Sequence, residues 1–82
     1  MIEELRCEYD TRKSFYGKAL VETNEGIKTL YSYETKVCEI RDGIPKVTWE
    51  GYSATTYRHI REFLRQNGFG KYSKKMIEEL ID

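Results

Sequence analysis

The side chains best suited to chemistry in this sequence are one histidine and two cysteines, His59, Cys7 and Cys38. A histidine can act as a general base and a cysteine as a nucleophile when the two lie within hydrogen-bonding distance. Neither cysteine is near His59 in the sequence, and the chain has no glycine-rich phosphate loop or nucleophile elbow. We therefore expect His59 to pack its ring at the rim of a core, and we do not expect an enzyme.

The same three residues are the candidates for a zinc site. A structural zinc ion takes about four ligands. Cys7, Cys38 and His59 supply three, without CxxC or HxxxH spacing, so that Asp10 or a second chain would have to supply the fourth. The prediction is no cofactor and two small, partly buried, reduced cysteines, with zinc as the alternative.

A second group of residues is suited to binding. Arg58, Arg61 and Arg65 are spaced i, i+3 and i+7, which places them on one face of a helix. Positive charge gathers in this part of the chain, because residues 41–75 carry eight Lys or Arg and three Asp or Glu. Such a stripe could contact phosphates or an acidic protein surface, and it could equally be the solvated face of an amphipathic helix. The candidate partner-binding residues are Arg58, Arg61, Arg65, Lys71, Tyr52 and Tyr72.

The overall charge favours a protein partner over nucleic acid. Acidic and basic groups balance to a net charge of zero, and the sequence pI of about 6.6 is below the value above about 9 that is typical of nucleic-acid-binding domains. Acidic residues such as Glu3, Glu4 and Glu8 would repel phosphate, and could instead meet a basic nucleic-acid channel of a nuclease. The alternative is that the sheet binds DNA. Strands that carry Lys28, Ser32, Lys36 and Lys46 on one face could lie in the major groove.

These residues need a sheet and helices to position them, and 82 residues make one domain, 1–82. Residues 18–49 predict an antiparallel meander of three or four strands. Its turns are marked by Asn24-Glu25-Gly26 and Asp42-Gly43. In the strand from Ile27 to Tyr33, Ile27, Thr29, Tyr31 and Tyr33 share one face, and we expect Tyr31 and Tyr33 to pack in the core or at its rim.

Two helices are predicted after the meander. A long helix over residues 53–67 is capped by Ser53, or by Thr55 if it begins late, and ends at Asn67-Gly68. Its buried stripe is Tyr57, Ile60, Phe63 and Leu64. Ser73 caps a short helix over residues 73–82. We expect Trp49 to cover the junction of sheet and long helix.

The fold class is therefore α+β: a three- to four-stranded antiparallel sheet packed on one long helix, followed by a short C-terminal helix. Residues 1–17 fit both a strand and a helix, and stay undecided. No stretch is apolar enough to span a membrane and the N-terminus lacks a signal-peptide pattern, so we expect a cytoplasmic protein. Both a monomer and a homodimer remain open.

Three strings of this sequence are distinctive: Ser14-Phe15-Tyr16-Gly17-Lys18-Ala19, Leu30-Tyr31-Ser32-Tyr33 and Tyr52-Ser53-Ala54-Thr55-Thr56-Tyr57-Arg58-His59-Ile60. Together they resemble a family of small proteins from phages and conjugative elements of Gram-positive bacteria. The resemblance covers roughly residues 12–68 and implies a mobile-element origin, without any catalytic residues. It implies an accessory protein that binds nucleic acid or disarms a host protein, such as a CRISPR nuclease. An inhibitor that binds a host protein is the leading hypothesis, and a small DNA- or RNA-binding module is the alternative.

Overall fold

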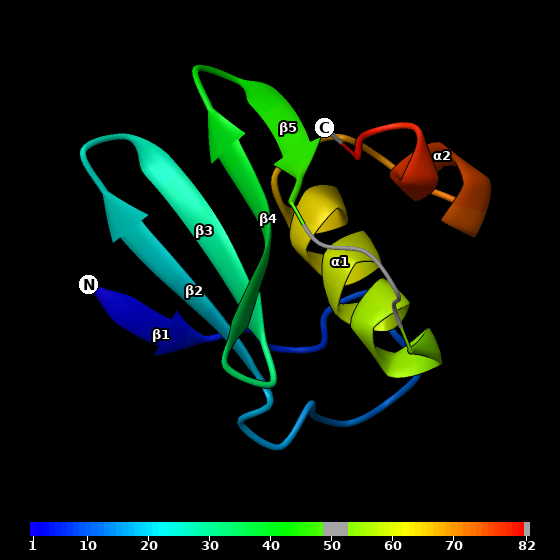
Figure 1. Ribbon diagram of the computed structural model, residues 1–82. Coiled ribbons are helices and arrows are strands. Elements are labelled where there is room, and N and C mark those ends of the chain that lie inside the picture. Colours follow the sequence, from blue (N-terminus) through cyan, green and yellow to red (C-terminus); the bar gives the residue numbers. More distant parts are fainter. Residues whose placement is uncertain (49–52, 82) are drawn as a thin grey trace.

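The computed structural model describes residues 1–48 and 53–81. Five strands form one sheet, and a helix lies across one of its faces in an α+β arrangement (Figure 1). The strands are β1 (Ile2–Glu4), β2 (Ala19–Asn24), β3 (Ile27–Ser32), β4 (Thr35–Arg41) and β5 (Ile44–Val47). The helices are α1 (Ala54–Gln66) and α2 (Lys74–Glu78).

The sheet is an antiparallel meander in the order β1-β2-β3-β4-β5. The predicted Asp42-Gly43 turn joins β4 to β5, with positive φ values of 52° and 75°. The prediction of three or four strands is wrong by one strand, because β1 adds an edge strand from the undecided N-terminal segment. All three residues of β1 are exposed. The strand is therefore held in place by backbone pairing with β2, and its sequence shows no apolar pattern that would predict it.

The inner face of the sheet is the opposite of the one expected for β3. Leu30 is fully buried and pairs with Cys38, which in turn pairs with Val47, and all three side chains are at 0% exposure. Tyr31 lies on the other face, where its hydroxyl donates to Glu22 at 3.2 Å. Tyr33 lies in the turn after β3 and is 50% exposed. The predicted inner face of β3 was therefore wrong. Burial of Leu30 determines which face packs on the core, and it outweighs the longer alternating run of Ile27, Thr29, Tyr31 and Tyr33.

Helix α1 closes the core with the predicted stripe. Tyr57, Ile60, Phe63 and Leu64 are all buried. Ser53 is the N-cap, since its Oγ accepts the N–H of Thr56 at 3.1 Å. The helix spans 13 residues, an ordinary length rather than a long one.

The end of the chain docks on the edge of the sheet. Helix α2 has five residues, fewer than the predicted 73–82 range, and buries Ile77. After α2 the Val47 N–H donates to the carbonyl of Leu80 at 3.0 Å, and Val47 pairs with Ile81 in a parallel bridge. This pairing partly covers the outer edge of β5. No helix of the described residues is long and apolar enough to cross a membrane.

Candidate functional site

Five of the six predicted partner-binding residues line one open groove beside α1. They are Arg58, Arg61, Arg65, Lys71 and Tyr72, and the groove has a volume of about 290 Å³. The remaining lining residues are Tyr9, Asp10, Thr11 and Glu62. The three arginines share one face of α1, as their i, i+3, i+7 spacing predicts, and this face lines the groove. Tyr52, the sixth candidate, and Trp49 lie outside the described residues.

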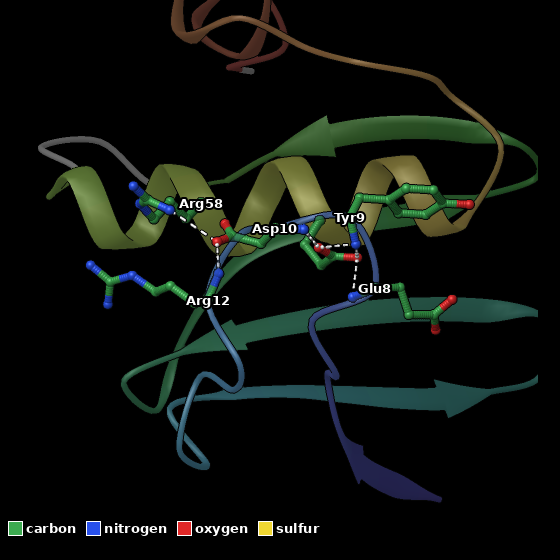
Figure 2. A network of polar contacts seen from close by, with 6 residues as sticks. Glu8, Tyr9, Asp10, Arg12 and Arg58 are labelled. Atoms are coloured by element: carbon green, nitrogen blue, oxygen red, sulfur yellow. Dashed lines mark hydrogen bonds and ion pairs between the residues drawn. The ribbon is translucent and has the colours of Figure 1, made fainter.

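The second wall of the groove is the N-terminal segment, which the Glu62 carboxylate holds against α1. Figure 2 shows this segment at Glu8, Tyr9 and Asp10 running beside the helix. Glu62 is 3% exposed. Its oxygens accept three successive backbone N–H groups, at 3.2 Å from Glu8, 3.1 Å from Tyr9 and 2.8 Å from Asp10. Gln66 adds a side-chain donor to Glu62 at 2.6 Å. A buried carboxylate with this many donors is fully satisfied, and it fixes the course of the segment.

Asp10 anchors the same segment to Arg58. Its Oδ1 lies 2.9 Å from an Arg58 guanidinium nitrogen and also accepts the backbone N–H of Arg12 at 2.9 Å. The Asp10 side chain is only 10% exposed. Figure 2 shows Arg12 and Arg58 approaching Asp10 from the loop and from α1. Both acidic side chains that line the groove are therefore engaged by donors of the protein itself.

The other cationic side chains of the groove form no ion pair within the described residues. The Arg65 guanidinium lies over the Tyr9 ring at 4.6 Å from its centroid, an arrangement that orients the group without neutralising it. Arg61 and Lys71 are exposed, and within residues 1–48 and 53–81 their side chains make no hydrogen bond or ion pair. Since Asp10 and Glu62 are satisfied internally, the groove presents net positive charge, and Tyr9 and Tyr72 also line it.

Another set of predicted residues, Lys28, Ser32, Lys36 and Lys46, is not brought together. Lys28 and Ser32 lie on the helix-facing side of β3, and Lys28 donates to the Asn67 side chain at 2.9 Å. Lys36 pairs with Glu39 at 2.7 Å, and Lys46 lies opposite Glu39 in register. The last two lysines therefore occupy the other face of the sheet, so no single basic sheet face exists among these four.

His59 is buried in the core, and its predicted place at the rim is wrong. It is 0% exposed, because β3 and the N-terminal segment both cover its side of α1. Its Nδ1 lies 2.8 Å from Ser32 Oγ, and its ring packs edge-on against Phe15 with centroids 4.5 Å apart. Burial, and secondarily the Arg12 charge, lowers the pKa of His59 to about 4, so the ring is neutral near pH 7.

The Ser32–His59 pair has the composition of a nucleophile and its base. Ser32 is 2% exposed and also lies 3.1 Å from Thr56 Oγ1, which accepts from Ser53 Oγ at 3.2 Å. A substrate could reach neither atom unless the core opened. The chain of hydroxyls therefore satisfies buried polar groups between sheet and helix.

The cysteines are separate from each other and from His59. Cys38 is fully buried in β4, and burial raises its pKa to about 12. Cys7 is half-buried, and burial followed by the Asp10 and Glu62 charges raises its pKa. Both are protonated thiols near neutral pH. Across residues 1–48 and 53–81, no three His, Cys, Asp or Glu side chains gather as a metal ion would require, and Cys7, Cys38 and His59 are not brought together.

Three residues that line the groove were not predicted to bind a partner: Asp10, Thr11 and Glu62. The available signal was Glu62, a single acid beside the apolar stripe of a helix whose exposed side is arginine. An acid at such a position needs donors from another segment. The sequence does not show which segment supplies them.

The three strings that carry the family resemblance meet at one end of the molecule. Phe15 belongs to the first string, Ser32 and Tyr33 to the second, and Thr56 and His59 to the third. Rings of Phe15 and Tyr33 pack on His59, and Ser32 contacts both Thr56 and His59. Segments far apart in sequence thus form one cluster between β3 and α1.

A comparison with known protein families gives one match, which covers most of the chain. A family model described as "Family of unknown function (DUF8033)" matches residues 3–79. The match spans nearly the whole chain, and the protein belongs to that family. No curated protein and no solved structure matches the chain.

Proposed function

We propose that this protein acts by binding, without catalysis, and that the groove beside α1 is its contact surface for an acidic region of a host protein. The observation that carries the proposal is the gathering of Arg58, Arg61, Arg65, Lys71 and Tyr72 on one groove. The resemblance to mobile-element proteins suggests the setting: an accessory protein in the cytoplasm of a bacterial host. A defence nuclease of the CRISPR type is the partner we put first.

The chemistry of the groove suits a protein contact. Arginine and tyrosine are the residues enriched at the energetic centres of interfaces. Arg58 is held by Asp10, and Arg65 rests on Tyr9, so both side chains are ordered before a partner arrives, which reduces the entropy lost on binding. Arg61 and Lys71 supply the charge that an acidic partner would pair with.

The groove is also small and open. Its volume of about 290 Å³ lies at the lower limit of the range, roughly 300–1,000 Å³, that is usual for pockets enclosing a small molecule. A surface of this size accommodates one or two side chains of a partner. This argues for a contact patch rather than a metabolite site.

The experiment is capture of host proteins on immobilised protein, combined with a nuclease assay. Arg61→Glu and Lys71→Glu reverse the two uncommitted charges, and we expect each to abolish capture and inhibition. Arg6→Glu is the matched control, because Arg6 is exposed and does not line the groove. Glu3→Lys asks whether the acidic edge at β1 makes the contact instead. Equal capture by wild type and Arg61→Glu would contradict the proposal.

Nucleic acid is the second candidate for the same groove. It is favoured by the regular spacing of Arg58, Arg61 and Arg65 in a groove that Tyr9 and Tyr72 also line, since cations and aromatic rings together are typical of single-strand binding. Retention of DNA or RNA that falls steeply with salt, and is lost with Arg61→Glu, would support it. Retention that Arg61→Glu leaves unchanged would exclude the groove as the site.

A further inference from the structure

The groove beside α1 has more positive charge than its own acids balance. Two acids line it, Asp10 and Glu62, and so do four cationic side chains, Arg58, Arg61, Arg65 and Lys71. Four positive and two negative formal charges leave a net charge of +2 in the lining. Neither acid is available to the exposed cations, because Asp10 contacts Arg58 at 2.9 Å and Glu62 accepts the N–H groups of residues 8–10.

The size of the groove limits how this charge is met. Its volume of about 290 Å³ admits one or two side chains of a partner. One carboxylate brings a single negative charge and would leave half of the excess unbalanced. One phosphomonoester brings a charge of about −1.5 to −2 at pH 7, and three acceptor oxygens, on one compact group. The charge and the volume together therefore fit a single dianionic group.

The cations of the groove suit phosphate in type as well as in number. Three are arginines, whose planar guanidinium binds two oxygens of a phosphate at once. Arg58 is held by an ion pair (Figure 2) and still has donors for a ligand, because a guanidinium carries five N–H groups. Arg65 is oriented by the aromatic ring beneath it. Arg61 and Lys71 are exposed and have no hydrogen bond or ion pair in the described part of the chain, so both are available to the ligand.

The excess of positive charge ends where the groove ends. The N-terminal segment and the end of α1 continue from the groove into a second hollow of about 270 Å³. There the acids outnumber the bases, with Glu3, Glu4 and Glu8 against Arg6 and Lys28. A nucleic-acid strand carries a negative charge at each nucleotide and would meet these acids on leaving the groove on this side. A single phosphoryl group on a protein side chain does not extend that far.

We propose that the groove binds a phosphorylated side chain of its protein partner. Arg61 and Lys71 pair with the phosphoryl oxygens, and Arg58 and Arg65 are the donors already fixed beside them. This inference rests on the proposed function of the groove and specifies the acidic group that the groove takes.

The test compares three short capped peptides of equal length that differ only at their centre, which is phosphoserine, serine or a pair of glutamates. Binding to the full chain is measured by calorimetry. We expect the phosphoserine peptide to bind at least about tenfold more tightly than the diglutamate peptide, and the serine peptide not to bind. Acidification from about pH 7.5 to about pH 5.5 should weaken the phosphoserine peptide several-fold, because the second pKa of its phosphate is about 6.

Two variants connect the binding to the groove. Arg61→Glu should lower the affinity for the phosphoserine peptide at least about tenfold, and it should keep the thermal midpoint of the wild type because Arg61 is exposed. Arg6→Glu makes the same change of charge outside the groove and should bind like the wild type. The inference is overturned if the wild type does not bind the phosphoserine peptide, if the diglutamate peptide binds equally well, or if Arg61→Glu binds like the wild type. Tighter binding of an oligothymidylate without a terminal phosphate would also overturn it, because the groove would then follow a nucleic-acid backbone.

A treated lysate separates failure of this inference from failure of the proposed function. Host lysate is incubated with an active or an inactivated broad-specificity protein phosphatase and then passed over the immobilised protein. Capture that requires the inactivated phosphatase, together with binding of the phosphoserine peptide, supports the inference. Equal capture from both lysates, lost with Arg61→Glu, overturns the inference and leaves an acidic protein contact in the groove. No capture from either lysate overturns both.

Discussion

Acidification should destabilise this protein through His59, and the size of the effect follows from burial. The folded-state pKa of His59 is lowered from 6.5 to about 4. Between these values the unfolded state binds a proton that the folded state does not, so the free energy of unfolding falls as pH falls through 6.5 towards 4. A difference of this size corresponds to about 3 kcal/mol. That is a large share of the total stability, about 5–15 kcal/mol, usual for a domain.

The assay is urea unfolding at a series of pH values from neutral to about 4, for the wild type and for His59→Gln. Glutamine cannot titrate but can still hydrogen-bond to Ser32. The pKa of Glu39 is lowered by its hydrogen bonds to Lys36 and Arg41, so Glu39 also loses stabilisation in acid. This contribution is common to both proteins and cancels in the difference.

We expect His59→Gln to be less stable at neutral pH and to show a flatter dependence on pH, so that the two curves converge by about 3 kcal/mol towards pH 4. Parallel curves would refute the reasoning. They would mean that His59 is protonated as easily in the folded protein as in the unfolded chain, and that the ring is not closed off from water.

Three further predictions follow from the buried groups. Glu62→Gln should lower the free energy of unfolding by about 3 kcal/mol in urea, because it weakens the charge-assisted hydrogen bonds of a buried carboxylate to three backbone amides; unchanged stability and unchanged hydrogen exchange at Tyr9 would contradict this. Glu34→Gly should raise the free energy of unfolding by about 0.5–1 kcal/mol by relieving a positive φ, and a lower value would show that Glu34 is not strained. A thiol reagent should modify native Cys7 at least about tenfold faster than Cys38, and equal rates would show that β4 opens readily.

The sequence predicted those elements whose signals are local. The Asp42-Gly43 turn, the Ser53 cap and the buried stripe of α1 each depend on a few neighbouring residues. The Tyr33-Glu34 turn contains no glycine, so its two central residues do not predict a hairpin turn in the way that Asp42-Gly43 does. Its conformation is enforced by contacts with Lys18 and His59, which come from distant parts of the chain.

One of the two walls of the candidate groove could be predicted from the sequence. The helical spacing of the arginines predicts one wall of the groove, because helix periodicity alone puts them on a common face. The opposite wall depends on Glu62 capturing the amides of residues 8–10, and a stretch without regular structure carries no pattern that predicts such a contact. Strand β1 was not predicted for the same reason, because its residues show no such pattern. His59 was misplaced because its cover comes from Phe15 and Tyr33, outside its own helix.

The central claim is that uncommitted positive charge in the groove beside α1 binds the partner. Quantitative capture from host lysate with wild type, Arg61→Glu and the control Arg6→Glu tests it most directly. We predict that wild type and Arg6→Glu retain the same host protein in similar amounts and that Arg61→Glu retains none of it. A host protein held equally by all three would contradict the claim, because the contact would then lie elsewhere on the molecule.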